Sequence, residues 1–270
     1  DEISIPGRKL MDLRYGENAH QKASVYITPN SNSIFRYIKH LSGRELSLTN
    51  LTDINAGVEA VRIFKQPAAV VIKHNNPCGI ALGNNIEQAL GRAIEADPES
   101  AFGGVIVLNE ILDIKTARII GEFRDERHGN IDIVAASYID ADALEFLRNV
   151  RKTMGIYAFG WIPKVNSKNL NFKWVDGGFV LQTPDIKIDR SFKDWEVVTR
   201  KKPTEKQLEQ MQIAWKFISR IRSNAIIVMD PGLSMTRGIG TGQTSRVRST
   251  KIALEQAGIH AKGEYRRVSN

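Results

Sequence analysis

The sequence predicts an α/β protein built from two layered units. Short apolar runs, typical of buried strands, alternate with stretches whose apolar residues recur at helical spacing. This alternation is regular up to about residue 150, weakens between about 151 and 200, and then resumes. We therefore expect one domain over residues 1–150, and a linker with irregular strands leading into a second domain over residues 151–270.

The elements of the first unit follow from periodicity and turn residues. Leu51, Ile54, Val58 and Val61 recur at helical spacing, whereas residues 68–72 form a continuous apolar run after Pro67. The elements expected here, in chain order, are a helix over 51–61, a strand over 68–72, a turn over 75–79, a helix over 86–94, strands over 104–108 and 131–135, and a helix over 141–150.

The second unit begins with the clearest helix start in the chain. Thr204 and Gln207 have the spacing of a capping box, in which two side chains satisfy backbone amides at a helix start. The expected elements are a helix with an apolar stripe at Leu208, Met211, Trp215 and Ile218, a strand over 225–229, a glycine-rich loop at Gly238, Gly240 and Gly242, and a helix over 245–257.

Composition limits the classes of function. The 270 residues carry a net charge of +8, which favours anionic partners. Basic residues are not interleaved with aromatic ones as in a nucleic-acid platform, and no run of about 18 apolar residues occurs. We therefore expect neither a nucleic-acid nor a membrane partner. The single cysteine, Cys78, cannot form an internal disulfide, and together with the absence of a signal peptide this predicts a cytoplasmic protein.

Metal chemistry is not expected. No two histidines are four residues apart, and Pro77-Cys78 lacks the second cysteine that a zinc-deaminase motif requires three residues later. Cys78 is expected to pack rather than to react.

Lys73 and His74 are the first candidates for chemistry. They lie where the strand over 68–72 should end, and ligands of open α/β sheets bind beyond the carboxyl ends of strands. A lysine beside a histidine can supply a cation and a base. The position of these two residues is also consistent with a solvated strand end that has no catalytic role.

Three further segments carry polar or glycine-rich clusters. In residues 13–21, Arg14 could hold a phosphate through paired donors, and Tyr15 could contact a base. Two glycines in residues 97–104 and three in residues 238–243 would let a backbone approach a ligand. Each segment taken alone also fits an ordinary loop, and the glycine spacing of the last is not the dinucleotide pattern.

The order of these segments resembles one family. Leu-Arg-Tyr-Gly-Glu-Asn-x-His-Gln at 13–21, Lys-His-x-Asn-Pro-Cys-Gly at 73–79, Asp-Pro-x-Ser-Ala-Phe-Gly-Gly at 97–104, Ser-Asn-Ala-Ile at 223–226 and Gly-Ile-Gly-x-Gly-Gln-x-Ser-Arg at 238–246 look like successive motifs of AICAR formyltransferase. That activity forms the C-terminal part of a bifunctional enzyme whose N-terminal part is IMP cyclohydrolase. The resemblance runs from about Leu10 to Lys262.

The resemblance implies a fold, a reaction and an assembly. The fold would be two cytidine-deaminase-like three-layer α/β domains without zinc. The reaction would transfer the formyl group of 10-formyltetrahydrofolate to the 5-amino group of AICAR, giving FAICAR in purine (IMP) biosynthesis. The assembly would be a homodimer with active sites at the subunit interface.

The resemblance also assigns roles to residues that match the motifs. Lys73, His74 and Asn224 would be catalytic. The substrate-binding residues would be Arg14, Tyr15, Ser100, Phe102, Gly103 and Arg246, and those on the folate side Asn75, Pro77 and Val247. The AICAR amine is a weak nucleophile, so a base such as His74 would take its proton. Lys73 and Asn224 could stabilise the developing oxyanion. Either Lys73 or His74 could protonate the leaving folate nitrogen.

The chain also departs from the family pattern. Only Asp1 to about Lys9 precedes the region of resemblance, so the cyclohydrolase half is not expected in this chain. After Gly263 the family's Asp-Ala-Phe-Phe-Pro-Phe segment does not follow, and residues 151–163 read unlike the family. These departures predict a truncated second domain. They leave open an alternative, a non-catalytic or weakly active relative that binds purine nucleotide and dimerises.

Overall fold

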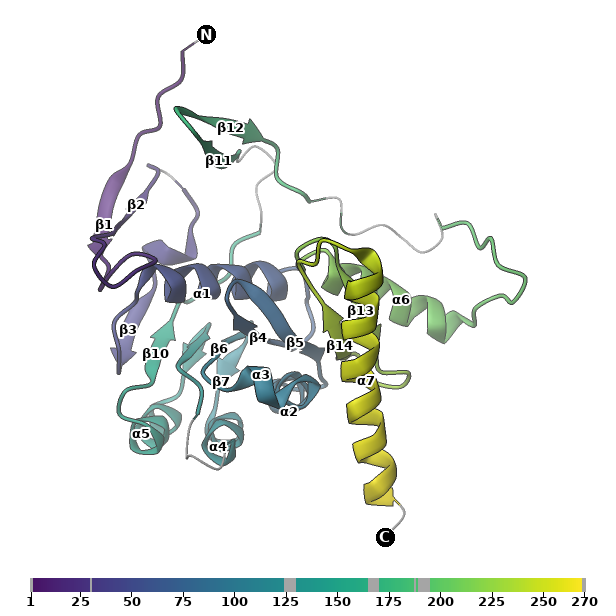
Figure 1. Cartoon of the computed structure of the whole chain (residues 1–270). Helices are drawn as coiled ribbons and strands as arrows, with labels where there is room; N and C mark the ends of the chain where they lie inside the picture. The colour runs from purple at the N-terminus through teal and green to yellow at the C-terminus, as the bar shows by residue number, and fades with distance from the viewer. Residues whose placement is uncertain are drawn as a thin grey trace.

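The computed structural model describes residues 2–29, 31–123, 130–164, 170–186, 188 and 195–268, with only the backbone described over 259–268. A six-stranded mixed sheet forms its centre, with the strand order β3-β10-β8-β6-β4-β5 (Figure 1). The strands in this order are β3 (Lys39–Ser42), β10 (Gly155–Ala158), β8 (Ile133–Ala136), β6 (Val105–Leu108), β4 (Ala68–Lys73) and β5 (Asn76–Leu82). β10, β8 and β6 are parallel, and β3, β4 and β5 run antiparallel to their neighbours.

Helices cover both faces of this sheet. Along β4, Ala68, Val70 and Ile72 pack with α1 (Leu48–Val61), whereas Ala69 and Val71 pack on the other face. That other face is covered by α2 (Ile86–Ala96), α4 (Ile114–Glu122) and α5 (Ala141–Val150). Because side chains alternate along a strand, one apolar run supplies both cores. The result is a three-layer α/β arrangement.

A second, smaller unit adjoins the β5 edge. It consists of the antiparallel pair β13 (Ile226–Met229) and β14 (Thr236–Gly240), with α6 (Glu205–Ile218) and α7 (Arg246–Val268) beside them (Figure 1). The amide of Leu82 donates to the carbonyl of Ser234 at 2.8 Å, and Ala81 forms a β-bridge with Met235. Backbone hydrogen bonds therefore join the two units.

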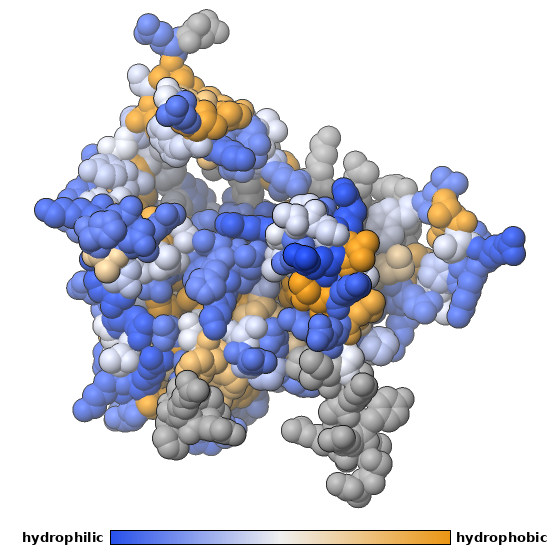
Figure 2. Space-filling model, viewed as in Figure 1, coloured by the Kyte–Doolittle hydropathy of each residue, from blue (hydrophilic) through white to orange (hydrophobic). Residues whose placement is uncertain are grey.

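Short elements complete the fold. They are β1 (Arg8–Asp12), β2 (Ser24–Ile27), η1 (Ile34–Arg36), α3 (Pro98–Ala101), β7 (Ile111–Leu112), β9 (Tyr138–Ile139), β11 (Asn171–Val175) and β12 (Gly178–Gln182). The hairpin β11–β12 exposes Trp174, Val175 and Val180. Figure 2 shows apolar side chains where this hairpin lies, at the top of the molecule.

The structure confirms the expected helices and buried strands and corrects three details of the backbone. The apolar stripe expected on α6 is also wrong in part, since Met211 and Trp215 are exposed and Phe217 is the buried residue of that helix. The turn expected over 75–79 is confined to His74 and Asn75, since β5 already begins at Asn76. Pro77 is tolerated there because β5 is an edge strand of the six-stranded sheet. The stretch expected to be linker contains β10, which lies inside the sheet between β3 and β8. The sheet therefore draws on residues from both sides of position 150.

The third correction concerns the expected glycine-rich loop. Gly238 and Gly240 lie in strand β14, not in a loop. A Cβ on Gly238 would lie 2.0 Å from the carbonyl oxygen of Ala253, and one on Gly240 would lie 1.9 Å from that of Ser249. Both carbonyls belong to α7. Glycine is required here because the helix backbone packs directly on the strand.

In the described residues, no helix is both long and apolar enough to cross a membrane.

Candidate active site

The candidate site lies at the end of the six-stranded sheet where β4 stops. Because β4 is antiparallel to β6, its carboxyl end lies beside the amino ends of the parallel strands. The register shows this directly, since Ile72 pairs with Val105 and Val105 pairs with Ile133. Lys73 therefore ends its strand as the sequence predicted. The three parallel strands, however, present their amino ends to the site.

His74 and Asn75 form the tight turn between β4 and β5. Both residues have positive φ, 54° and 61°. Two-residue hairpin turns need this left-handed backbone, which non-glycine residues adopt uncommonly, asparagine and histidine more often than most. The amide of Asn75 donates to Oδ1 of Asp53 at 2.6 Å, and Nδ2 of Asn76 donates to the carbonyl of His74 at 3.0 Å. These contacts hold the exposed imidazole on a fixed backbone.

Asp53 on α1 is a residue that the sequence analysis missed. Its residue surface is only 8% exposed. Burial raises the pKa of this carboxyl, while the Asn75 amide and the charge of His74 lower it, with a net upward shift. The sequence did contain a signal for Asp53, since it lies next to Ile54 in the predicted helix. A carboxylate beside a buried apolar stripe needs a hydrogen-bond or ionic partner.

Lys73 contacts the segment over 97–104. Its Nζ donates to the carbonyl of Phe102 at 2.8 Å, which leaves two of the three ammonium donors for other partners. Ser100 lies in α3, and Gly103 has a φ of 69° with open space where a Cβ would stand. The structure therefore brings together the residues predicted from two separate motifs.

Asn224 reaches the same region from the second unit. Its Nδ2 donates to the carbonyl of Gln243 at 2.9 Å. Thr241 lies two residues before Gln243, and its hydroxyl donates to Oδ1 of Asn76 at 3.0 Å. This hydrogen bond links the segment around Asn224 to the turn that carries His74. It was not foreseen, because Asn76 and Thr241 are 165 positions apart in the sequence.

The remaining predicted residues differ in exposure. Arg246 and Val247 begin α7 and are both exposed, Val247 by 64%. Pro77 is buried within β5, and its role on the folate side stays a prediction. Cys78 donates its thiol to the carbonyl of Val71 at 3.3 Å, and burial raises its pKa to about 12. The cysteine therefore packs, as expected.

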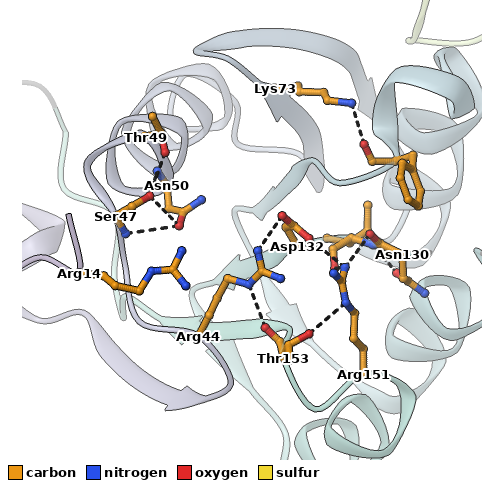
Figure 3. A network of polar contacts seen from close by, with 12 residues as sticks. Arg14, Arg44, Ser47, Thr49, Asn50, Lys73, Asn130, Asp132, Arg151 and Thr153 are labelled. Atoms are coloured by element: carbon orange, nitrogen blue, oxygen red, sulfur yellow. Dashed lines mark hydrogen bonds and ion pairs between the residues drawn. The ribbon is translucent and has the colours of Figure 1, made fainter. Parts of the chain in front are cut away.

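Arg14 and Tyr15 lie at the other side of this end of the sheet. Nη2 of Arg14 donates to the Tyr15 hydroxyl at 2.9 Å, and the guanidinium lies 4.7 Å from the centre of the ring. The amide of Leu48 donates to the Tyr15 carbonyl, which places the pair at the start of α1. Arg14 and Lys73 face the same end of the sheet from different sides (Figure 3).

Two arginines and an aspartate form a cluster at this end of the sheet, drawn below Lys73 and to the right of Arg14 in Figure 3. Asp132 accepts from Arg44 at 2.8 Å and from Arg151 at 2.9 Å (Figure 3). Arg44 follows β3, Asp132 precedes β8 and Arg151 precedes β10, so only the folded sheet assembles them. One carboxylate between two guanidinium groups leaves this end of the sheet positive, which suits an anionic ligand. In the described part of the chain, no group of three or more potential metal-binding side chains occurs.

Comparison with known proteins identifies relatives over nearly the whole chain. Residues 1–256 match the family model described as AICARFT/IMPCHase bienzyme. The bifunctional purine biosynthesis protein PurH of Thermoanaerobacter sp. (strain X514) is 40% identical over 256 residues, covering 94% of this chain and 48% of that relative. The PurH protein of Oceanobacillus iheyensis is 38% identical over 264 residues, covering 97% of this chain and 50% of the relative.

The chain thus spans about half the length of the curated relatives that it matches. The family match extends over all five motifs named above. The chain belongs to the AICARFT/IMPCHase bienzyme family.

Proposed function

We propose that this chain carries the formyl-transfer activity of its family. Its substrates would be AICAR and 10-formyltetrahydrofolate, and its products FAICAR and tetrahydrofolate, in purine biosynthesis. The observation that carries the proposal is the His74–Asn75 turn. His74 occupies a left-handed position that few non-glycine residues adopt, the turn is tied to a buried carboxylate, and a lysine lies directly before it. Unfavourable backbone conformations of this kind cluster at functional sites.

His74 is proposed as the general base. The 5-amino group of AICAR must lose a proton as it attacks the formyl carbon, because its lone pair is delocalised into the ring. An imidazole titrates near neutral pH and can take that proton. The exposed imidazole on a turn held by Asp53 and Asn76 can meet a bound substrate without moving the backbone.

Lys73 and Asn224 are proposed to stabilise the oxyanion that forms on the formyl oxygen. Lys73 retains two donors beyond its bond to Phe102, and the Asn224 amide retains one hydrogen beyond its bond to Gln243. Donors held in place before the reaction stabilise developing charge at little reorganisation cost. Collapse of the intermediate breaks the bond to the folate nitrogen, which then takes a proton from Lys73 or from protonated His74.

Arg14 is proposed to bind the phosphate of the nucleotide. Its guanidinium is exposed and is oriented by the Tyr15 hydroxyl and ring. Arg44 and Arg151 add positive potential beside it and are neutralised only in part by Asp132. Ser100, Phe102 and Gly103 would border the nucleotide, with Asn75 and Val247 on the folate side.

We also propose the family's cytidine-deaminase-like fold and homodimeric assembly for this chain. The three-layer order of the first unit supports the fold. The exposure of Arg14, Arg246 and Val247 supports a site that a second subunit completes. Sedimentation of the purified chain tests the assembly.

The direct test is an assay of the purified chain with AICAR and 10-formyltetrahydrofolate, with FAICAR and tetrahydrofolate quantified together. Equal formation of both products, lost in a Lys73→Ala variant, supports the proposal. Nucleotide binding without turnover would instead support a non-catalytic relative. Conversion of FAICAR to IMP without formyl transfer would show that the chain carries the other activity of the family.

A further inference from the structure

A cavity lies at the opposite end of the six-stranded sheet from the candidate active site. It has a volume of about 900 Å³ and is lined by residues that follow the carboxyl ends of β8 and β10 and by residues at the amino end of β3. Cavities of about 300–1,000 Å³ typically hold small ligands, and ligands of open α/β sheets bind beyond the carboxyl ends of strands. In this sheet, the cavity lies beyond the carboxyl ends of the parallel strands, where such ligands bind.

Three aromatic side chains border this cavity. Tyr37, Tyr138 and Trp161 are 56%, 58% and 67% exposed. They come from three separate segments that follow η1, β8 and β10. Within the described part of the chain, the hydroxyl groups of both tyrosines and the indole nitrogen of Trp161 make no hydrogen bond. Three exposed rings with unused polar atoms around one cavity are suited to stacking on a planar ligand.

Among the described residues that line the cavity, the charged ones are both cations. They are Arg36 and Lys39, and this described lining contains no carboxylate. Asp140 and Asp142, at the start of α5, are not among the lining residues. Lys39 forms no ion pair within the described residues, and Arg36 makes only a long contact of 3.4 Å to the carbonyl of Thr28. Both cations are therefore available to an anionic group.

Hydrogen bonds to backbone carbonyls hold the walls of the cavity together. The amide of Gly160 donates to the carbonyl of Ser137 at 2.9 Å, and Nη2 of Arg148 donates to the carbonyl of Leu41 at 2.7 Å. Gly160 has a φ of 71°, a left-handed conformation that turns the chain just before Trp161. The aromatic and cationic side chains thus stand on segments held to one another, which limits the ordering cost of binding.

We propose that this cavity binds a planar heteroaromatic anion, a small molecule that carries a ring system and a phosphate or carboxylate. The ring lies against Trp161 and the two tyrosines, and the anionic group contacts Arg36 and Lys39. This site is separate from the one that holds Lys73 and His74. It does not depend on the reaction proposed above.

Binding of AMP, adenosine and inorganic phosphate to the full chain, measured by calorimetry, tests the proposal. An Arg14→Ala background removes the phosphate contact expected at the other end of the sheet. AMP should bind, and Trp161→Ala should weaken AMP and adenosine by about tenfold or more. Arg36→Gln combined with Lys39→Gln should weaken AMP and phosphate and leave adenosine unchanged.

Trp174→Ala is the matched control, because Trp174 is equally exposed but lies on the β11–β12 hairpin outside the cavity. It should leave the affinity for AMP unchanged. The proposal is overturned if AMP does not bind or if Trp161→Ala has no more effect than Trp174→Ala. It is also overturned if Trp161→Ala changes the sedimentation mass instead, since a second copy of the chain would then cover the cavity.

Discussion

Strand β4 buries five of its six residues, whereas all four residues of β13 are only half-buried. The first strand lies in a sheet with helices on both faces, and the second belongs to a two-stranded pair beside α6 and α7. Two-stranded pairs are marginal unless something packs against them. The smaller unit therefore depends on close glycine contacts with α7 and on its backbone bonds to β5.

This difference matters for the candidate site, since both units contribute to it. Lys73, His74 and Asp53 stand on the well-packed sheet and its helix. Asn224 stands on the weaker unit and is linked to the turn through Thr241 and Asn76. We therefore expect changes in the first unit to lower activity without loosening the sheet, and changes in the second unit to lower activity by loosening that unit. The following predictions test that division.

The largest effect is expected for His74→Ala. Loss of a positioned general base should lower kcat by roughly 10²–10⁴-fold, while AICAR binding persists. His40→Ala, which removes an imidazole from β3, is the control and should stay near the wild-type rate. Steady-state kinetics and calorimetry measure the two quantities. A loss below about tenfold would exclude His74 as the base.

Asp53→Ala should come next. Without the acceptor for the Asn75 amide, the turn should shift, and misplacement of about 1 Å can cost about 10²-fold in rate. Asp53→Asn keeps an oxygen acceptor and should retain most of kcat. The pKa of Asp53 is raised by burial, so its charge opposes folding at neutral pH, and the Asn variant should not lower Tm. Equal kinetic losses in both variants would contradict this positioning role.

Arg14→Ala should weaken binding of the AICAR nucleotide. A charge-assisted contact to phosphate contributes about 1.5–3 kcal/mol. Binding of the unphosphorylated nucleoside should change little, because it lacks the group that Arg14 holds. Calorimetry with both ligands separates these cases. If both lose affinity equally, Arg14 supports the local structure rather than the phosphate.

Gly240→Ala should loosen the smaller unit alone. The added methyl would lie 1.9 Å from the Ser249 carbonyl, so α7 must move away from β14, at a cost of about 1–3 kcal/mol. Amide hydrogen exchange should rise in β13 and β14 and stay unchanged in β4. Gly178→Ala, on β12, meets nothing within 4 Å and is the control. Simultaneous loosening of β4 would show that the two units unfold together.

Lowering the pH should produce the smallest effect, a local rise in amide exchange. Burial raises the pKa of Asp230, but the amides of Gly232 and Leu233 and the Arg237 guanidinium lower it more, with a net downward shift. Its contribution to stability is present above the ordinary carboxyl value of 3.8 and is lost as the pH falls through the lower folded value. Exchange in β14 should therefore rise below about pH 4 before exchange in β4 does. An Asp230→Asn variant should show a weaker dependence on pH.

The strongly patterned elements could be predicted from the sequence. The stripe at Leu51, Ile54 and Val58 identified α1, and the apolar run over 68–72 identified β4. The strand β10 was missed because its four residues, Gly-Ile-Tyr-Ala, are too short and too mixed to show a period. Its burial comes from β3 and β8, which lie far away in the sequence.

The candidate site likewise combines residues that the sequence predicted with contacts that only the structure shows. Five motifs in order were enough to single out Lys73, His74, Arg14 and Asn224, whose catalytic and binding roles stay predictions. Motif order could not show that Asp53 holds the turn, or that Thr241 joins it to the second unit. These contacts depend on how helices and strands pack, not on neighbours in the chain.

The sequence by itself determined the family, the alternation of helices and strands, and the residue types available for chemistry, because periodicity and motifs are local properties. Only the tertiary structure decided that the parallel strands present their amino ends to Lys73, that Asp132 pairs with Arg44 and Arg151, and that Gly240 lies in a strand. Each of these follows from strand direction or from close backbone approach. Such features arise from contacts between residues that are distant in sequence and near in space.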